Sequence, residues 1–423
     1  MVRSKFGLCL GQDERRRARY QRSEGGGRLV AALAARYRDL DVAEEAFAEA
    51  CARAAAAWAR QGAPRDPSAW LYRTAERAAL DSFRRQRTRE RLAPDPPSPE
   101  PTVEDALVDD ANLIPDERLR LIFVCCHPAV APEARAALTL RLVCGLSARE
   151  IARAFLISEP TLLQRLVRAK RKIADAGVSF EIPGPEAWPE RLDAVLSTLE
   201  VAYVKAHEDA AGAGPHASYA AEILELTRVL TELLPSEPEA LALAALVRYA
   251  EARRPARLDE HGAMVPLSDQ EPKLWRRPLI HAAEAYLKRA AALGGLGPRA
   301  FQAAIQSAWC ARKSLVEPPP WRTVLGLYDA LLAYRDDPVV RLNRAVAVAE
   351  IVDAPTALRD VEALDRGALA SFLPYHAVRA DLLRRAGRVE EARLAYEAVL
   401  ALDPAPAERL WLERRRSGLG PSG

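Results

Sequence analysis

The chain has 423 residues, of which 49% are hydrophobic and 28% are charged, a composition typical of a soluble globular protein with two or three domains. The 61 Lys and Arg residues nearly balance the 58 Asp and Glu residues, so the overall charge of +3 does not indicate a nucleic-acid partner. No apolar run approaches the ~20 residues that a membrane span needs, and the N-terminus lacks the apolar segment of a secretory signal. We therefore expect a cytoplasmic protein with no membrane partner.

The charge is distributed unevenly along the chain. Residues 1–176 hold 31 basic and 24 acidic side chains, whereas the remainder holds 30 basic and 34 acidic ones. A basic front part and an acidic back part indicate different partners for the two. The few aromatic residues and the abundance of Ala, Leu, Arg and Glu predict an all-α fold. The six cysteines show no Cys-x-x-Cys spacing, which indicates reduced thiols.

Proline- and glycine-rich stretches divide the chain into five parts. Residues 1–27 are expected to form a flexible N-terminal arm, and residues 28–92 a first helical domain. Five prolines between residues 94 and 101 mark a Pro-rich acidic linker over residues 93–114, because proline cannot continue a helix. Residues 115–177 form a second helical domain. Residues 178–423 are predicted to be helices joined by Pro and Gly turns.

The first helical domain contains an acidic segment followed by a basic one. Glu45 and Glu49 are four residues apart and share one helix face, which suits a basic partner or a solvated surface. The segment 70–89 interleaves arginines with Trp70 and Tyr72, which suits a strand with partly unstacked bases. A surface helix whose C-terminal arginines answer the helix dipole would give the same pattern.

The second helical domain contains a helix–turn–helix pattern over residues 145–172. Ser147 and Glu150 have the spacing of a capping box, and Ser158 is the expected N-cap of the second helix. Thr161, Gln164 and Arg165 lie near the start of that helix, where base edges are read, and the later basic cluster suits phosphates. An ordinary amphipathic hairpin with a solvated basic face is the alternative. The buried face of the second helix is predicted to consist of Leu162, Leu166, Ala169 and Ile173.

The end of the chain carries a repeat-like pattern. Small residues, a glycine, an aromatic residue and a proline follow one another from Ala380 to Pro404 with tetratricopeptide-like offsets. A fainter copy precedes it, so that Ala357 and Ala392 are 35 positions apart. Such helix pairs stack into arrays that bind a peptide or another protein. We therefore expect a tetratricopeptide-like C-terminal domain with a protein or peptide partner, although a purely stabilising role is the simpler alternative.

In this order, the segments resemble bacterial RNA polymerase sigma factors of the extracytoplasmic-function type, in particular the subgroup with a C-terminal tetratricopeptide-like extension. The segment 41–58 is similar to the helix that binds core polymerase, and 69–85 looks like the helix that reads the minus-ten element. The segments 122–129 and 137–172 resemble the fourth conserved region, which reads the minus-thirty-five element. The resemblance implies a sigma factor that binds core polymerase and directs promoter-specific transcription initiation.

The resemblance also implies site residues. The carboxylates expected to meet the clamp helices of the largest polymerase subunit are Asp41, Glu44, Glu45 and Glu49. The residues expected at the minus-ten element are Trp70, Arg73, Arg77, Arg84, Arg85 and Arg87. The residues expected at the minus-thirty-five element are Ser158, Thr161, Gln164, Arg165, Arg168, Lys170, Arg171 and Lys172. The Pro-rich linker would keep the two DNA-contacting modules apart on an extended promoter.

Two other classes of protein are the alternatives to a sigma factor, a one-component regulator and an enzyme. A one-component helix–turn–helix regulator with a ligand- or protein-sensing repeat domain would explain the second domain and the tail, but not the acidic and basic segments of the first. An enzyme is not expected, because Cys125, Cys126 and His127 form the only suggestive cluster, and adjacent cysteines rarely chelate a metal together. We therefore predict no catalytic residue, no metal and no cofactor.

Overall fold

The computed structural model is helical throughout the part of the chain that it describes. The described residues are 26–62, 64–90, 117–143, 147–155, 157–178, 188–208, 217–364, 369 and 372–419. Within them the only β-type pairing is an isolated bridge between Leu258 and Met264, so the predicted all-α fold is confirmed. The predicted linker 93–114 and nearly all of the predicted arm 1–27 lie outside the described residues. The described chain divides into two compact units, one ending at Leu233 and the other beginning at Leu234.

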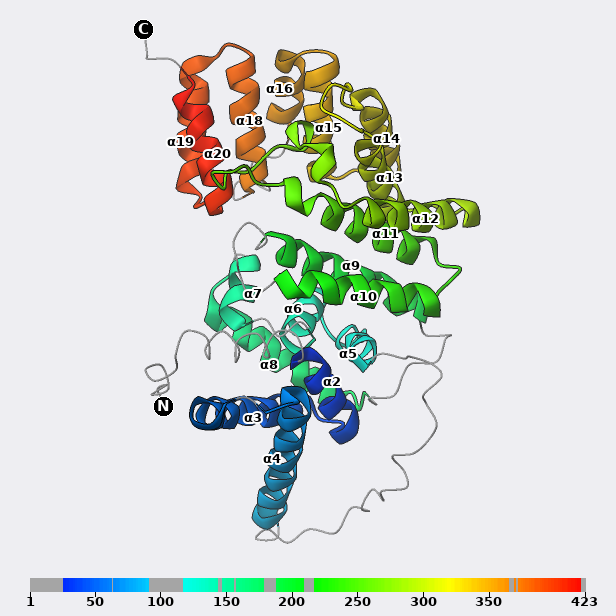
Figure 1. Cartoon of the computed structure of the whole chain (residues 1–423), viewed down its shortest axis with the longest axis vertical. Helices are drawn as coiled ribbons and strands as arrows, with labels where there is room; N and C mark the ends of the chain where they lie inside the picture. The colour runs from blue at the N-terminus through cyan, green and yellow to red at the C-terminus, as the bar shows by residue number, and fades with distance from the viewer. Residues whose placement is uncertain are drawn as a thin grey trace. The chain divides into compact units, whose positions relative to one another are not determined.

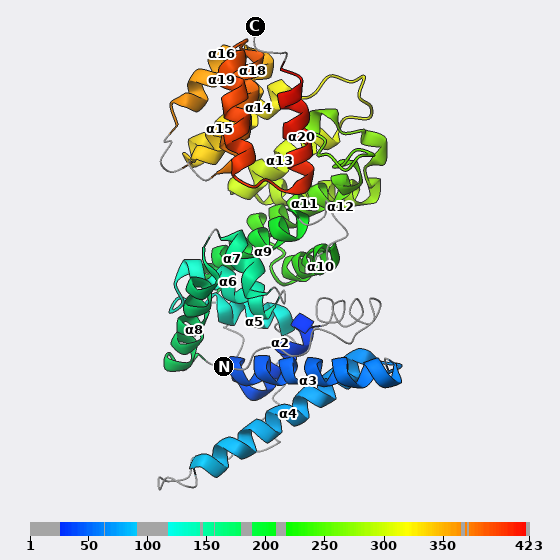
Figure 2. The same ribbon diagram turned by 90° about the vertical axis from the view of Figure 1, so that its left-hand side faces the viewer.

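Three helices open the first unit and form its N-terminal bundle: α2 (Gly26–Tyr37), α3 (Leu40–Gln61) and α4 (Pro67–Glu90). Figure 2 shows the long helix α4 crossing α3 at an angle. The two helices are held together in part by the edge-on packing of Trp58 on Trp70, whose ring centroids are 5.5 Å apart. The chain leaves α3 through Gly62, whose φ of 73° favours a residue without a side chain.

Four shorter helices form the middle bundle of the first unit: α5 (Glu117–Cys125), α6 (Pro132–Leu142), α7 (Ala148–Ala154) and α8 (Glu159–Asp175). Ser158 is the N-cap of α8, because its hydroxyl accepts the N–H of Thr161 at 3.3 Å, as the sequence predicted. The four residues predicted for its inner face are all buried. Helices α7 and α8 therefore form the expected helix–turn–helix, with the turn residue Leu156 outside the described residues.

Two more helices complete the first unit, α9 (Trp188–Glu208) and α10 (Ala217–Leu233). The sequence placed the start of the C-terminal domain at residue 178, but the compact unit extends beyond it to Leu233. The reason is that α9 packs against α6 and α5, which gives α9 the same core as the middle bundle. The thiol of Cys126 at the end of α5 and the hydroxyl of Thr198 on α9 lie 3.7 Å apart in this core.

The N-terminal and middle bundles are joined within the first unit. Helix α2 packs against α5 and also touches α6. Val30, Leu33 and Ala34 of α2 are buried, as is most of α5. The sequence predicted two modules kept apart by a linker, whereas the apolar faces of α2 and α5 bring them together here, because burial of apolar surface favours contact.

The second unit consists of further helices in chain order. They are α11 (Pro238–Arg253), α12 (Arg277–Leu293), α13 (Pro298–Cys310), α14 (Trp321–Tyr334), α15 (Pro338–Ile351), α16 (Ala354–Glu362), α18 (Leu373–Arg385), α19 (Val389–Ala401) and α20 (Pro406–Ser417). Three short 3₁₀ turns lie between α11 and α12 at Arg254–Ala256, Leu267–Asp269 and Pro272–Leu274. Successive helices pack on each other, and α18 and α19 lie side by side (Figure 1).

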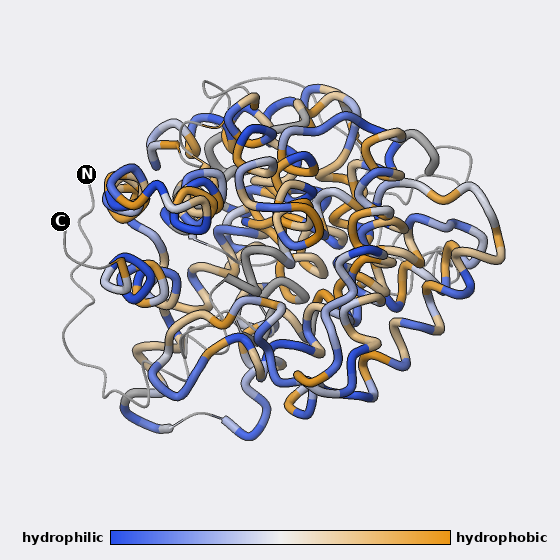
Figure 3. The backbone as a smooth tube through the Cα atoms, turned by 90° about the horizontal axis from the view of Figure 1, so that it is seen from above, coloured by the Kyte–Doolittle hydropathy of each residue, from blue (hydrophilic) through white to orange (hydrophobic). Residues whose placement is uncertain are grey.

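Small residues let two helix pairs of the second unit approach closely. Ala357 on α16 and Ala392 on α19 are both fully buried, at equivalent places in the pairs α15–α16 and α18–α19. Gly387, with a φ of 77°, makes the turn between α18 and α19. Figure 3 shows hydrophobic and hydrophilic residues interspersed along the backbone of the described chain. Among the described residues, no helix combines the length and apolarity needed to cross a membrane.

Candidate DNA- and protein-binding surfaces

The outward face of α8 presents the polar side chains that the sequence predicted to contact DNA. The predicted residues that are exposed are Ser158, Thr161, Gln164, Arg168, Arg171 and Lys172, and Arg165 is half-buried. The apolar side chains of Leu163 and Val167 are exposed among them. The hydroxyls of Ser158 and Thr161 lie 2.7 Å apart, so both take part in starting the helix. Arg171 lies 3.6 Å from Asp175 one turn later, and both side chains remain well exposed. The exposed face of α8 thus carries several basic side chains, most of them beyond its first turn.

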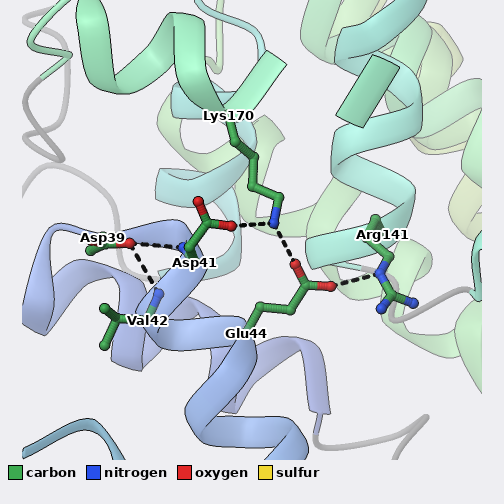
Figure 4. Close-up of polar contacts among 6 residues, drawn as sticks. All are labelled: Asp39, Asp41, Val42, Glu44, Arg141 and Lys170. Carbon is green, nitrogen blue, oxygen red and sulfur yellow. Dashed lines mark hydrogen bonds and ion pairs between the residues drawn. The ribbon is translucent and has the colours of Figure 1, made fainter. Parts of the chain in front are cut away.

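Lys170 differs from the other basic residues of α8, because it faces the N-terminal bundle. Its ammonium lies 2.5 Å from Asp41 Oδ1 and 2.9 Å from Glu44 Oε2, both on α3 (Figure 4). Only 15% of the Lys170 side chain is exposed. The structure therefore brings one residue predicted to bind DNA into contact with two residues predicted to bind polymerase.

Arg141 of α6 completes this contact. Its Nε donates to Glu44 Oε1 at 2.7 Å, while the other oxygen of Glu44 accepts from Lys170 (Figure 4). Asp39, the N-cap of α3, accepts the N–H groups of Asp41 and Val42 at 2.8 and 3.0 Å, and so fixes the turn that carries Asp41. Sequence reasoning missed Arg141, because nothing in the local pattern pairs residues that are 97 positions apart.

The two carboxylates set the protonation of Lys170. Burial alone lowers the pKa of a lysine, because it penalises the charged form. Here the hydrogen bonds to Asp41 and Glu44 outweigh burial, so the pKa of Lys170 lies above its ordinary value. The ammonium therefore stays charged at neutral pH and holds both carboxylates.

Glu45 and Glu49 lie on a different face of α3. They line a groove of about 780 Å³ between α3 and α4. The floor of the groove is made by small residues, which include Ala46 and Ala78, and Asp81 lies on its α4 side. Glu49 also pairs with Arg53 one turn later at 2.9 Å. The four carboxylates that the sequence grouped together thus form two pairs, one facing α8 and α6 and one lining the groove.

On α4, the predicted minus-ten residues fall into three groups. Trp70 is half-buried against Trp58 and so helps to hold α4 on α3. Arg73, Arg77 and Arg84 are exposed, and Arg84 lies 3.7 Å from Asp81. The side chains of the remaining two, Arg85 and Arg87, lie outside the described part of the structure.

The cysteine–histidine cluster is part of the core. Cys125 and Cys126 are buried, and burial raises the pKa of the Cys126 thiol to about 11, so the thiol is protonated and unreactive. His127 Nδ1 accepts the N–H of Ala129 at 3.1 Å. Burial, followed by the nearby Arg191 and Arg135, lowers the pKa of His127. Among the residues described, no group of three or more His, Cys, Asp or Glu side chains is placed to hold a metal ion.

Comparisons with known proteins give these surfaces a context. Residues 25–89 match the family model Sigma-70 region 2, and residues 120–173 match Sigma-70, region 4. Residues 191–291 match DUF6596, a family of unknown function. The chain is also 40% identical over 389 residues to an uncharacterized protein of Rhizobium meliloti (strain 1021), which covers 90% of this chain and 91% of that protein. No solved structure matches the chain.

Proposed function

Because the chain belongs to the sigma-70 family of RNA polymerase sigma factors, we propose that it binds core polymerase and directs it to a two-part promoter. Proteins of this family initiate transcription and are not enzymes. Its partners are accordingly RNA polymerase and promoter DNA, and its place is the cytoplasm.

The observation that carries the proposal is the exposed polar face of α8, which lies within the segment that matches region 4. Gln164 stands near the start of the helix, where side chains reach base edges, and amide groups pair with adenine in the major groove. Arg168, Arg171 and Lys172 follow within two turns, and their charges suit phosphates. A helix–turn–helix with this distribution is suited to the minus-thirty-five element.

The matching surfaces of the N-terminal bundle support the rest of the proposal. The exposed arginines Arg73 and Arg77 lie on α4, within the segment that matches region 2, and suit the backbone of the minus-ten element. The groove is lined by Glu45, Glu49 and Asp81 and also by Arg53 and Arg84. It therefore offers three carboxylates and small side chains to a basic helix of the largest polymerase subunit, with two arginines beside them. Asp41 and Glu44 would extend this acidic surface.

We further propose that the second unit receives a protein or peptide and so regulates the factor. Support comes from the stacked helix pairs, which resemble arrays that present a binding surface. A chain that ends at Leu233 retains the whole first compact unit. Transcription that is the same from this shorter chain and from the full chain would contradict a regulatory role.

The test of the main proposal is transcription in vitro with purified full chain, core polymerase and genomic promoter fragments. We expect discrete transcripts that require both the chain and the core enzyme. The double variant Gln164→Ala with Arg168→Ala removes two predicted DNA contacts. It should abolish start-site selection but bind core polymerase as the wild-type chain does. If the wild-type chain neither binds core polymerase nor yields a specific transcript, the proposed function is wrong.

A further inference from the structure

We propose that Asp41, Glu44, Arg141 and Lys170 form an intramolecular clasp, which holds the polymerase-binding helix α3 on the DNA-binding bundle and opens when polymerase takes α3. The inference rests on the proposed function, because it assigns a regulatory role to part of the same polymerase-binding surface. It concerns the free chain, in which no polymerase competes for these carboxylates.

The clasp is built from three ion pairs between helices that are distant in the sequence. Glu44 is shared: Oε1 lies 2.7 Å from Arg141 Nε and Oε2 lies 2.9 Å from Lys170 Nζ. Lys170 also reaches Asp41 at 2.5 Å. Two cations from two different helices, α6 and α8, therefore grip one turn of α3 (Figure 4).

Burial separates the Lys170–Glu44 pair from ordinary surface pairs, whereas Asp41, the other partner of Lys170, is 68% exposed. The Lys170 and Glu44 side chains are 15% and 22% exposed, whereas those of the Arg171–Asp175 pair on the same helix are 82% and 68% exposed. Ion pairs at exposed sites contribute little, while a partly buried charge that loses its partner is destabilising. Lys170 is therefore expected to stay paired with Asp41 and Glu44 unless another anionic group takes their place.

The clasp and the partners compete for the same groups. Asp41 and Glu44 are occupied while the clasp is closed, so polymerase must displace Arg141 and Lys170 to reach them. Lys170 is likewise held away from DNA until α3 is released. Binding of polymerase at α3 would thus free a cation on α8 for promoter phosphates, and the coupling is reciprocal.

Arg141 permits a clean test, because it lies in neither predicted binding surface. Arg141→Ala removes one of the three ion pairs and leaves every predicted polymerase and DNA contact in place. We expect it to raise the affinity of the full chain for core polymerase up to about fivefold, the range for one exposed or partly exposed ion pair. Arg141→Lys, which keeps the cation, should restore most of the wild-type affinity.

The matched control is Arg149→Ala, which removes one exposed arginine from α7 of the same bundle. It changes the net charge by the same amount and should leave core affinity unchanged. Circular dichroism of each variant shows whether the chain is folded, so that a gain of affinity is not confused with loss of structure.

A direct readout is zero-length carbodiimide crosslinking of the full chain, with mass spectrometry of the peptides. We expect an amide between Lys170 and Asp41 or Glu44 in the free protein, a lower yield in Arg141→Ala, and loss of the product when core polymerase is added. Absence of the crosslink in the free chain would overturn the clasp.

The outcomes separate the clasp from the proposed function. If core polymerase binds wild type and Arg141→Ala equally, and the crosslink persists in the complex, the clasp as a competitor is wrong while the sigma-factor function stands. If core polymerase does not bind the wild-type chain at all, the proposed function fails and the competition with it.

Discussion

Several ion pairs between helices of the two units differ in how far apart their partners lie in the sequence. In the second unit, three pairs that join α14 to α15, α16 to α18 and α15 to α18 connect residues 15, 17 and 35 positions apart. In the first unit, the pairs made by Arg141 and Lys170 span 97, 126 and 129 positions. These helix–helix pairs of the second unit join near neighbours in the sequence, although Arg414 on α20 also pairs with Asp259, 155 positions earlier. The pairs of Arg141 and Lys170 join the N-terminal and middle bundles of the first unit.

This difference in sequence separation affects which ion pairs a binding partner can displace. Closing a loop of 126 residues instead of 35 costs about 1 kcal/mol more chain entropy, of the same order as an exposed ion pair contributes. A stack of local helix pairs is stabilised between nearest neighbours and is not opened by displacing one distant contact. The long-range pairs of the first unit are therefore suited to a reversible role and the short-range pairs of the second to a structural one.

The largest effect is expected from the buried carboxylate of Glu251 in the second unit. Its Oε1 lies 2.9 Å from Arg276 and 3.2 Å from Arg254, and its side chain is only 5% exposed. Glu251→Ala leaves these cations without their shared acceptor and should lower the free energy of unfolding by about 3 kcal/mol. Urea unfolding measures the change. Glu260→Ala, at an exposed site, is the control. Equal stabilities of the two variants would show that the buried ion pairs of Glu251 contribute nothing to the free energy of unfolding.

A smaller effect is expected on the outward face of α8. Arg168→Ala should weaken binding of promoter DNA by the polymerase complex about tenfold, and reduce its salt dependence by about one counterion if the contact is to phosphate. The matched control in the second unit is Arg409→Ala, whose side chain pairs with Asp403 at 3.0 Å. Titrations over a range of salt concentrations test both variants. The same loss for Arg409→Ala would mean that the second unit also contacts DNA.

Local patterns in the sequence were enough to predict much of α8. The N-cap Ser158 and the buried stripe from Leu162 to Ile173 follow from side-chain spacing alone, because capping and amphipathicity act within a few turns. For the same reason, the glycine turn and buried alanines of the last helix pairs were predictable from offsets between small residues.

Long-range features were not predictable in this way. The spacing of Asp41, Glu44, Glu45 and Glu49 places them on one acidic helix, but does not show that two of them face α6 and α8 while two line a groove. The packing of α9 on α6, which carries the first compact unit beyond the predicted boundary at residue 178, is likewise a tertiary contact that the local sequence pattern does not show. Only the folded chain brings such residues together.

The N-cap of α8 gives a more local test of the first unit. Ser158→Ala removes the oxygen that accepts the N–H of Thr161 and should lower the free energy of unfolding by about 1 kcal/mol. Ser158→Thr, which keeps a hydroxyl, should lose less. Chemical unfolding followed by circular dichroism measures both variants. A loss of equal size in the two would assign the effect to packing and not to the cap.

The smallest effect is expected for an exposed pair of the second unit. Arg414 and two backbone N–H groups lower the pKa of Asp259 below its ordinary value. A lowered pKa in the folded state means that the carboxylate contributes stability above the ordinary value, about 3.9, and that this contribution disappears as the pH falls through the lower folded value. Asp259→Asn should therefore be slightly less stable than wild type at pH 7, and the difference should shrink at a pH well below the ordinary pKa of an aspartate, about 3.9. Thermal unfolding at both pH values tests this, and a difference that does not change with pH would mean that the side chain acts through its neutral hydrogen bonds and not through its charge.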